Sequence, residues 1–140
     1  MRRRFSYPVA MKRKHGKTES VRFTFTLDST DPERLASFWA SALGYSKLGE
    51  FGVFWPLAPN DDSEPPLIIQ RVTEAKLGKN RMHLDLHVSD LPSEATRLEA
   101  LGAKQMSDRV ITEHDHQWLV MTDPDGNEFC VVQRPPGVPT

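Results

Sequence analysis

Three ionisable side chains alternate along one short segment of the chain. His83, Asp85 and His87 are separated by apolar residues, and side chains two residues apart on a strand point to the same face. Such a polar row needs water, a ligand or mutual contacts. Because imidazole and carboxylate groups can carry a proton near neutral pH, the row indicates an acid/base or ligand-binding surface. A solvated sheet face, or a His83 held by Asp85 or a backbone carbonyl, is the structural alternative.

Cys130 and Glu128 are two further candidates near the end of the chain. Cys130 is the single cysteine, which excludes an internal disulfide and fits a reducing compartment. A cysteine within an apolar strand is usually a small buried residue, whereas its thiolate would be a soft ligand that favours Zn²⁺. A nucleophilic role would need an electropositive, partly open setting, such as His83 nearby. Glu128, two residues earlier, could carry a proton.

The first half of the chain predicts one helix among four strands. Asp31 is a suitable N-cap, Pro32 fits the first helical position, and Gly44 ends the apolar stripe of the helix. Apolar and polar residues alternate before this helix, and short apolar runs follow it. The predicted order is strand 21–27, helix 31–44, two short strands within 45–58, and strand 67–72.

The second half repeats this plan. Arg22 precedes Asp31 by nine residues, and Arg81 precedes Asp90 by nine. The offset between the two copies is 59 residues. A unit of this length is too small to bury its own sheet face, so two copies are expected to pack together. The predicted elements are strand 81–88, helix 90–101 ended by Gly102, a strand or hairpin arm over 104–112, strand 117–122 and strand 128–133.

The charge is distributed unevenly. Residues 1–20 carry seven of the 18 lysines and arginines but only one of the 19 acidic residues. We therefore expect a disordered basic arm over 1–20 and an acidic folded part that disfavours a nucleic-acid partner. No apolar run is long enough to cross a bilayer, and no secretory signal is evident, so we expect a cytoplasmic protein without a membrane partner.

Three blocks of the sequence resemble one known group of proteins. The blocks are Phe25–Asp28 with Asp31–Trp39, Lys79–Val88, and Trp118–Cys130. They are similar to glyoxalase-like domains of the vicinal-oxygen-chelate superfamily, which includes glyoxalases, bleomycin-resistance proteins and dioxygenases. The resemblance covers residues 21–134. It implies an α+β fold in which two β-α-β-β-β modules, about 21–72 and 81–133, pair into a cupped mixed sheet, followed by a loose tail over 135–140.

The resemblance also implies a site. Metal-binding members place ligands on the first and last strand of each module, which here are Thr24, Gln70, His83 and Cys130. A slip of two residues would instead bring in Ile68 or Glu128. Members that bind metal typically have His with Glu or Gln at these places, so threonine and cysteine are departures. Both outcomes therefore stay open: a divalent metal (Zn, Ni, Mn or Fe) held by His83, Gln70 and Cys130, and no metal.

Two functions follow from the resemblance. The first is a lyase or isomerase that acts on a carbonyl substrate, with protons moved by His83, His87, Asp85 or Glu128. The second is a non-catalytic protein that sequesters a small aromatic or cationic ligand, as bleomycin-resistance proteins do. A third, an interaction protein that uses the basic arm, has less support. The expected ligand-binding residues are Thr24, Gln70, Trp55 and Cys130, and the expected assembly is a homodimer.

Overall fold

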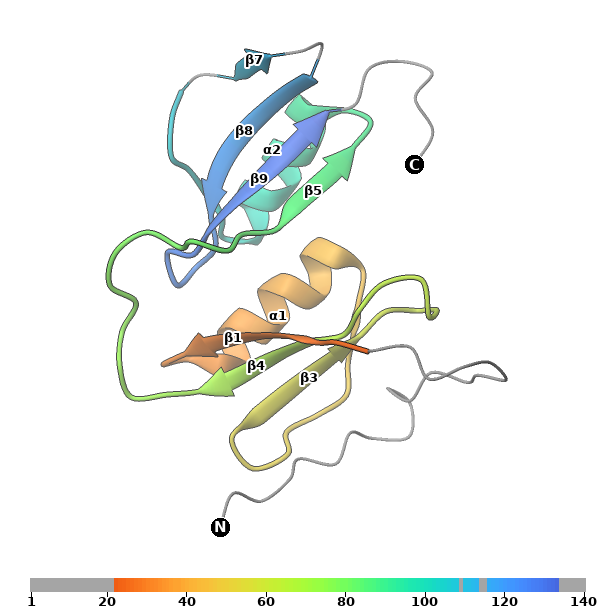
Figure 1. Ribbon diagram of the computed structural model, residues 1–140, viewed down its shortest axis with the longest axis vertical. Coiled ribbons are helices and arrows are strands. Elements are labelled where there is room, and N and C mark those ends of the chain that lie inside the picture. Colours follow the sequence, from red (N-terminus) through yellow and green to blue (C-terminus); the bar gives the residue numbers. More distant parts are fainter. Residues whose placement is uncertain (1–21, 109, 114–115, 134–140) are drawn as a thin grey trace. The chain divides into compact units, whose positions relative to one another are not determined.

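The computed structural model describes residues 22–108, 110–113 and 116–133. The chain divides between Glu74 and Ala75 into two compact units, each with its own sheet and helix (Figure 1). The expected basic arm (1–20) and loose tail (135–140) lie outside the described residues. None of the described helices is both long and apolar enough to span a membrane.

The first unit is a β-α-β-β-β module. Strand β1 lies parallel to β4, and β4, β3 and β2 follow as antiparallel neighbours, in the order β1-β4-β3-β2. The helix forms where it is predicted, because the Asp31 side chain accepts a hydrogen bond from the N–H of Arg34 and Gly44 adopts φ 68° at the C-cap. The elements are β1 (Phe25–Ser29), α1 (Pro32–Leu43), β2 (Ser46–Lys47), β3 (Phe54–Ala58) and β4 (Leu67–Arg71).

The second unit repeats this order with one addition. Strand β5 lies parallel to β9, and the sheet order β5-β9-β8-β6 matches that of the first unit, while β7 pairs with β8. The two helices start 59 residues apart, at Pro32 and Leu91, which confirms the predicted repeat. The elements are β5 (Asp85–Val88), α2 (Leu91–Leu101), β6 (Lys104–Gln105), β7 (Ile111–Glu113), β8 (His116–Thr122) and β9 (Glu128–Gln133).

Three predicted strands differ from the structure. The strand predicted over 21–27 is observed as β1, Phe25–Ser29. The strand predicted over 81–88 begins only at Asp85, because its partner β9 begins at Glu128 and the register places Asp85 opposite Cys130. Little partner strand is therefore left beside Arg81. The arm predicted over 104–112 is divided into β6 and β7, which pair with opposite ends of β8.

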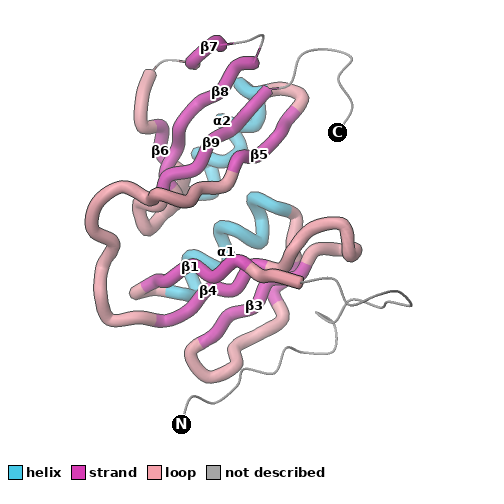
Figure 2. Tube along the Cα trace, in the orientation of Figure 1, coloured by secondary structure: helices cyan, strands magenta, loops and turns pink. Residues whose placement is uncertain are grey.

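Each sheet buries one face beneath its own helix. In the second unit, the buried side chains of the sheet are Leu119, Met121, Phe129 and Val131, and α2 lies against β8 and β9 (Figure 2). The alternate side chains of the same strands are half-buried or exposed and form the opposite face. We call the face of each sheet that points away from its helix the open face. In the first unit this face includes the buried residues Ala58 and Ile68.

A hydrogen-bonded turn joins β8 to β9 and fixes their register. Asp123 is buried, with 2% of the residue exposed. Its carboxylate accepts hydrogen bonds from the N–H groups of Asp125 and Asn127, both at 2.9 Å. It also accepts from the Asn127 side-chain amide at 2.8 and 3.0 Å. Gly126 takes φ 85°, which favours glycine. The turn holds the start of β9, the strand that carries Cys130.

Candidate functional site

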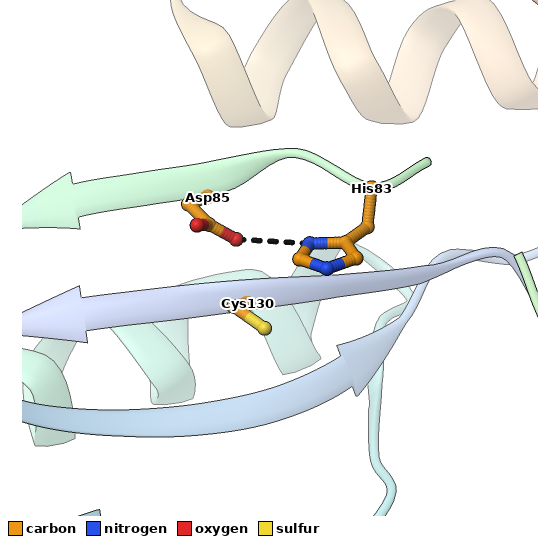
Figure 3. Close-up of side chains that lie close together, drawn as sticks. All are labelled: His83, Asp85 and Cys130. Carbon is orange, nitrogen blue, oxygen red and sulfur yellow. Dashed lines mark hydrogen bonds and ion pairs between the residues drawn. The ribbon is translucent and has the colours of Figure 1, made fainter. Parts of the chain in front are cut away.

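The open face of the second sheet brings together three of the predicted site residues. Asp85 on β5 lies directly opposite Cys130 on β9, and the N–H of Cys130 donates to the carbonyl of Leu84 at 2.9 Å. His83 precedes β5, and its Nδ1 lies 3.0 Å from Oδ1 of Asp85. Possible ligand atoms of His83, Asp85 and Cys130 all lie within 4.8 Å of one another. His83 and Asp85 are turned toward one another, and Cys130 lies on the neighbouring strand (Figure 3).

The contact between His83 and Asp85 determines which ring nitrogen of His83 stays available for a ligand. Both side chains are partly open to solvent, at 41% and 46% exposure. If Nδ1 carries the proton it donates to the carboxylate, and Nε2 is then left as a basic nitrogen or a ligand. The sequence allowed either a solvated histidine or one held by Asp85, and the structure shows the second arrangement.

The Cys130 thiol is kept protonated by its surroundings. Burial raises its pKa above the ordinary value of 9.0, and the negative charge of Asp85 and a hydrogen bond to the Asp85 carboxylate raise it further, whereas Lys79 lowers it. A thiol in this state is a poor nucleophile. The environment therefore does not support a nucleophilic Cys130, but it leaves the sulfur beside two other ligand groups.

Glu128 has a structural arrangement that sequence reasoning did not anticipate. One carboxylate oxygen accepts from the N–H of Asn80 at 2.8 Å, and the other pairs with Lys76 Nζ at 3.2 Å. The Asn80 N–H is the main reason why the pKa of Glu128 is lowered below 4.5, with a smaller contribution from Lys76, against the opposing effect of burial. A carboxylate held in this way is a weak base, which argues against its predicted role in proton transfer.

His87 lies on the same face of β5 as Asp85 but is not part of the cluster of three. It is exposed and lies opposite Val132. Since alternate residues of a strand are about 7 Å apart, His87 stands one position further along the open face. An imidazole there is placed beside the cluster rather than within it.

Sequence reasoning gave no site role to Trp118. Trp118 on β8 lies opposite Val132, so it shares a row of the open face with His87, and it is half-buried. The alternation within 116–122 could have indicated this, because Leu119 and Met121 occupy the buried face. The row therefore offers an aromatic and aliphatic surface next to the polar cluster.

The first unit carries the remaining predicted residues, and the register changes one of them. Thr26 lies opposite Ile68, and Asp28 lies opposite Gln70. With the offset of 59 residues, Thr26 corresponds to Asp85, so the counterpart of Cys130 is Ile68, the alternative left open by the sequence, and not Gln70. Thr24 corresponds to His83 and precedes β1 in the same way.

Trp55 belongs to the core of the first unit and does not line its open face. Its residue is 4% exposed, and its indole N–H donates to Oε2 of Glu33 on α1 at 2.9 Å. The guanidinium of Arg71 lies 5.0 Å from the centre of the ring. Trp55 lies opposite Ile69, in a row covered by the helix, and its role in ligand binding stays a prediction.

The donor sets of the two units differ in whether they suit a metal ion. The second unit offers an imidazole nitrogen, a carboxylate oxygen and a sulfur within one cluster, a set that suits Zn²⁺. At the equivalent places the first unit has Thr24, Thr26 and Ile68, which offer only hydroxyl oxygens and hydrocarbon. The residues that fit a metal are therefore those of the second unit.

The two repeated β-α-β-β-β modules define a class of small α+β proteins. A family model for the glyoxalase-like domain matches residues 24–132. The chain belongs to the glyoxalase-like domain family, as the sequence resemblance predicted. A comparison with curated protein sequences gives no match.

Solved structures share the fold at low sequence identity. A glyoxalase/bleomycin resistance protein/dioxygenase family enzyme from Burkholderia phytofirmans PsJN aligns with a TM-score of 0.66 and 15% identity over 79% of this chain and 95% of that one. A glyoxalase/bleomycin resistance protein/dioxygenase from Nocardioides aligns with a TM-score of 0.66 and 14% identity over 88% and 89%. A glyoxalase-related enzyme from Fulvimarina pelagi gives 0.64 and 19% over 84% and 89%. These likenesses establish the fold.

Proposed function

We propose that the chain is a lyase or isomerase that acts on a small carbonyl compound at the open face of its second sheet. The observation that carries the proposal is that three side chains able to hold a divalent ion, those of His83, Asp85 and Cys130, lie on the same sheet face as a separate imidazole, His87. Carbonyl chemistry of this kind needs both a group that stabilises a developing oxyanion and a group that moves a proton.

Each part of the face has its own task in this proposal. The carbonyl oxygen lies beside the cluster, and His87 takes the proton from the neighbouring carbon and returns it at a second position. Trp118 and Val132 contact the apolar part of the substrate. A divalent ion held by His83, Asp85 and Cys130 would supply positive charge beside the oxygen. Glu128 is a positioning residue, because it anchors the segment that leads to His83.

Exchange of a carbon-bound proton tests this function without knowledge of the substrate. Wild-type protein is incubated in D₂O with a panel of small aldehydes, ketones and α-hydroxycarbonyl compounds, and loss of the α-proton signal is followed by NMR. At least one compound should exchange its α-proton faster with the protein than without it. His87→Ala should slow that exchange by about 10²-fold or more. Asp28→Asn, which alters an exposed strand carboxylate in the first unit, is the matched control. Exchange that persists in His87→Ala would contradict the assignment of the base.

A second function, ligand sequestration without turnover, is favoured by a different observation. The open face of the first sheet carries an apolar cluster in which Ala58 and Ile68 are buried and Leu48 and Phe54 pack against them. A hydrophobic face of this kind suits binding of an aromatic compound more than acid/base chemistry. Saturable quenching of tryptophan fluorescence by bleomycin or a planar cationic dye, with no α-proton exchange in the panel, would support this function over the enzyme.

A further inference from the structure

The three clustered donors of the second unit are sufficient for a metal site by themselves. We propose that His83, Asp85 and Cys130 bind one Zn²⁺ ion within a single module, with Asp85 as a direct ligand and no ligand from Thr24 or Gln70. The proposal deepens the proposed function, because the ion would occupy the cluster beside the carbonyl oxygen. Binding of the ion needs no substrate, so the two proposals can fail separately.

The distances suit a shared ion. Two ligands on one tetrahedral Zn²⁺ are about 3.3–3.6 Å apart, given metal–ligand bonds of about 2.0–2.3 Å. Possible ligand atoms of His83, Asp85 and Cys130 lie within 4.8 Å of one another, and the hydrogen bond of 3.0 Å between Nδ1 of His83 and Oδ1 of Asp85 holds the imidazole beside the carboxylate. Since His83 and Asp85 are partly exposed, small side-chain rotations suffice to bring the donors to ligand distances.

The backbone already holds the donors in place. Asp85 and Cys130 are direct neighbours across the parallel pair β5 and β9, fixed by the bond from Cys130 N–H to the Leu84 carbonyl at 2.9 Å. The segment before His83 is anchored by the bond from Asn80 N–H to Glu128 at 2.8 Å. Ligands held before the ion arrives lose less conformational freedom on binding.

The chemistry of the donors selects the ion. Binding of the ion would displace the thiol proton of Cys130, and the resulting thiolate and the Asp85 carboxylate would offset the charge of a divalent ion, while the imidazole adds a neutral donor. Sulfur with nitrogen suits Zn²⁺ and not Mg²⁺ or Ca²⁺, which prefer sets of oxygen ligands. Three protein ligands also leave one position open, as in catalytic zinc sites, where a substrate oxygen can bind.

The experiment uses the full chain, purified without a histidine tag and stripped with a chelator. Zn²⁺ binding is measured by calorimetry, and Co²⁺ is used as a spectroscopic probe because a sulfur ligand gives a near-ultraviolet charge-transfer band. We expect one ion per chain and a sulfur–cobalt band that is lost in Cys130→Ser. His83→Ala and Asp85→Asn should each weaken Zn²⁺ binding at least tenfold, with circular dichroism unchanged.

Variants in the first unit distinguish this site from one that spans both modules. Asp28→Asn is the matched control for Asp85→Asn and should leave the affinity within twofold of wild type, as should Thr24→Ala and Gln70→Ala. The proposal is overturned if Asp85→Asn binds Zn²⁺ as wild type does, or if Thr24→Ala or Gln70→Ala weakens binding as much as His83→Ala. It is also overturned if wild-type protein binds Co²⁺ without the sulfur band. Zinc binding without α-proton exchange would refute the proposed function but leave the metal site supported.

Discussion

Replacement of Glu128 by alanine tests whether this carboxylate has a structural or a catalytic role. Its side chain is 13% exposed, and its oxygens bind the N–H of Asn80 and the ammonium group of Lys76, a side chain 20% exposed. These contacts tie residues 76–80 to the start of β9. The alanine variant leaves the Asn80 N–H and the Lys76 charge without this acceptor.

The magnitude follows from the two contacts. A hydrogen bond to a charged group contributes about 1.5–3 kcal/mol, and a partly screened ion pair adds up to about 1 kcal/mol. Glu128→Ala should therefore lower the free energy of unfolding by about 2–4 kcal/mol. Glu128→Gln keeps an oxygen for the Asn80 N–H but loses the ion pair, so its cost should be about 1 kcal/mol.

Urea unfolding followed by circular dichroism measures these costs, with Glu50→Ala, the loss of an exposed carboxylate, as the control. The effect should also depend on pH in a defined direction. Because the folded protein lowers the pKa of Glu128 below 4.5, its stabilisation is complete above pH 4.5 and is lost as the pH falls through the folded value. Equal stability of Glu128→Ala and wild type at pH 7 would refute the structural assignment. Loss of α-proton exchange in Glu128→Gln at unchanged stability would restore its role in proton transfer.

Three further outcomes are expected. Asp123→Ala removes the acceptor for the buried amide groups of Asn127, so it should lower the free energy of unfolding by about 2–4 kcal/mol in urea; a loss below about 0.5 kcal/mol would contradict this. The pKa of Glu33 is lowered below 4.5 mainly by its hydrogen bond to Lys47 and then by that to Trp55. The stability difference between wild type and Glu33→Gln should therefore be present above pH 4.5 and vanish as the pH falls through the pKa of Glu33 in the folded protein. A difference that grows in acid would contradict this prediction. Light scattering at micromolar concentration should give the mass of a homodimer, because both sheets end in an edge strand, β1 or β5; a monomer mass would refute it.

Much of the fold could be predicted because its signals are local. Asp31 and Asp90 cap the two helices with their own side chains, and glycines with positive φ end them. Each of these features acts within a few residues, so the sequence alone is enough to place them. The repeat could be predicted for the same reason, since the caps recur at a constant offset.

The site could be predicted only in part because it depends on register and on tertiary contacts. Alternation placed Asp85 and His87 on one face, and the structure agrees. It could not show that Trp55 donates to Glu33 beneath the helix, because both faces of β3 are rich in apolar residues. The role of Glu128 depends on Asn80, a partner 48 residues away in the sequence, and no local pattern indicates such a contact.

The assignment of Gln70 shows how a small slip in register changes the chemistry. A shift of two residues keeps a side chain on the same face but moves it about 7 Å along the strand. Gln70 is therefore on the open face but in the row of Asp28, whereas Ile68 occupies the row that corresponds to Cys130. An amide oxygen in that row would have added a possible metal ligand, whereas the isoleucine side chain offers none.

The same register predicts that the missing donors can be installed. Thr24→His, Thr26→Asp and Ile68→Cys reproduce in the first unit the residues that the second unit has at equivalent places, on strands with the same parallel pairing. The triple variant should lower the free energy of unfolding by about 1–2 kcal/mol. Most of this loss comes from the smaller side chain at Ile68, a residue that is 3% exposed. If the register of the parallel strands and the donor types are sufficient for the site, the triple variant should bind two Zn²⁺ ions per chain where wild type binds one, measured by calorimetry and elemental analysis. The Thr24→Ala, Thr26→Ala and Ile68→Ala triple variant controls for the changes in volume. A donor variant that folds cooperatively and still binds a single ion would show that an anchor such as Glu128, which ties the segment before His83 to β9, is needed as well as the ligands.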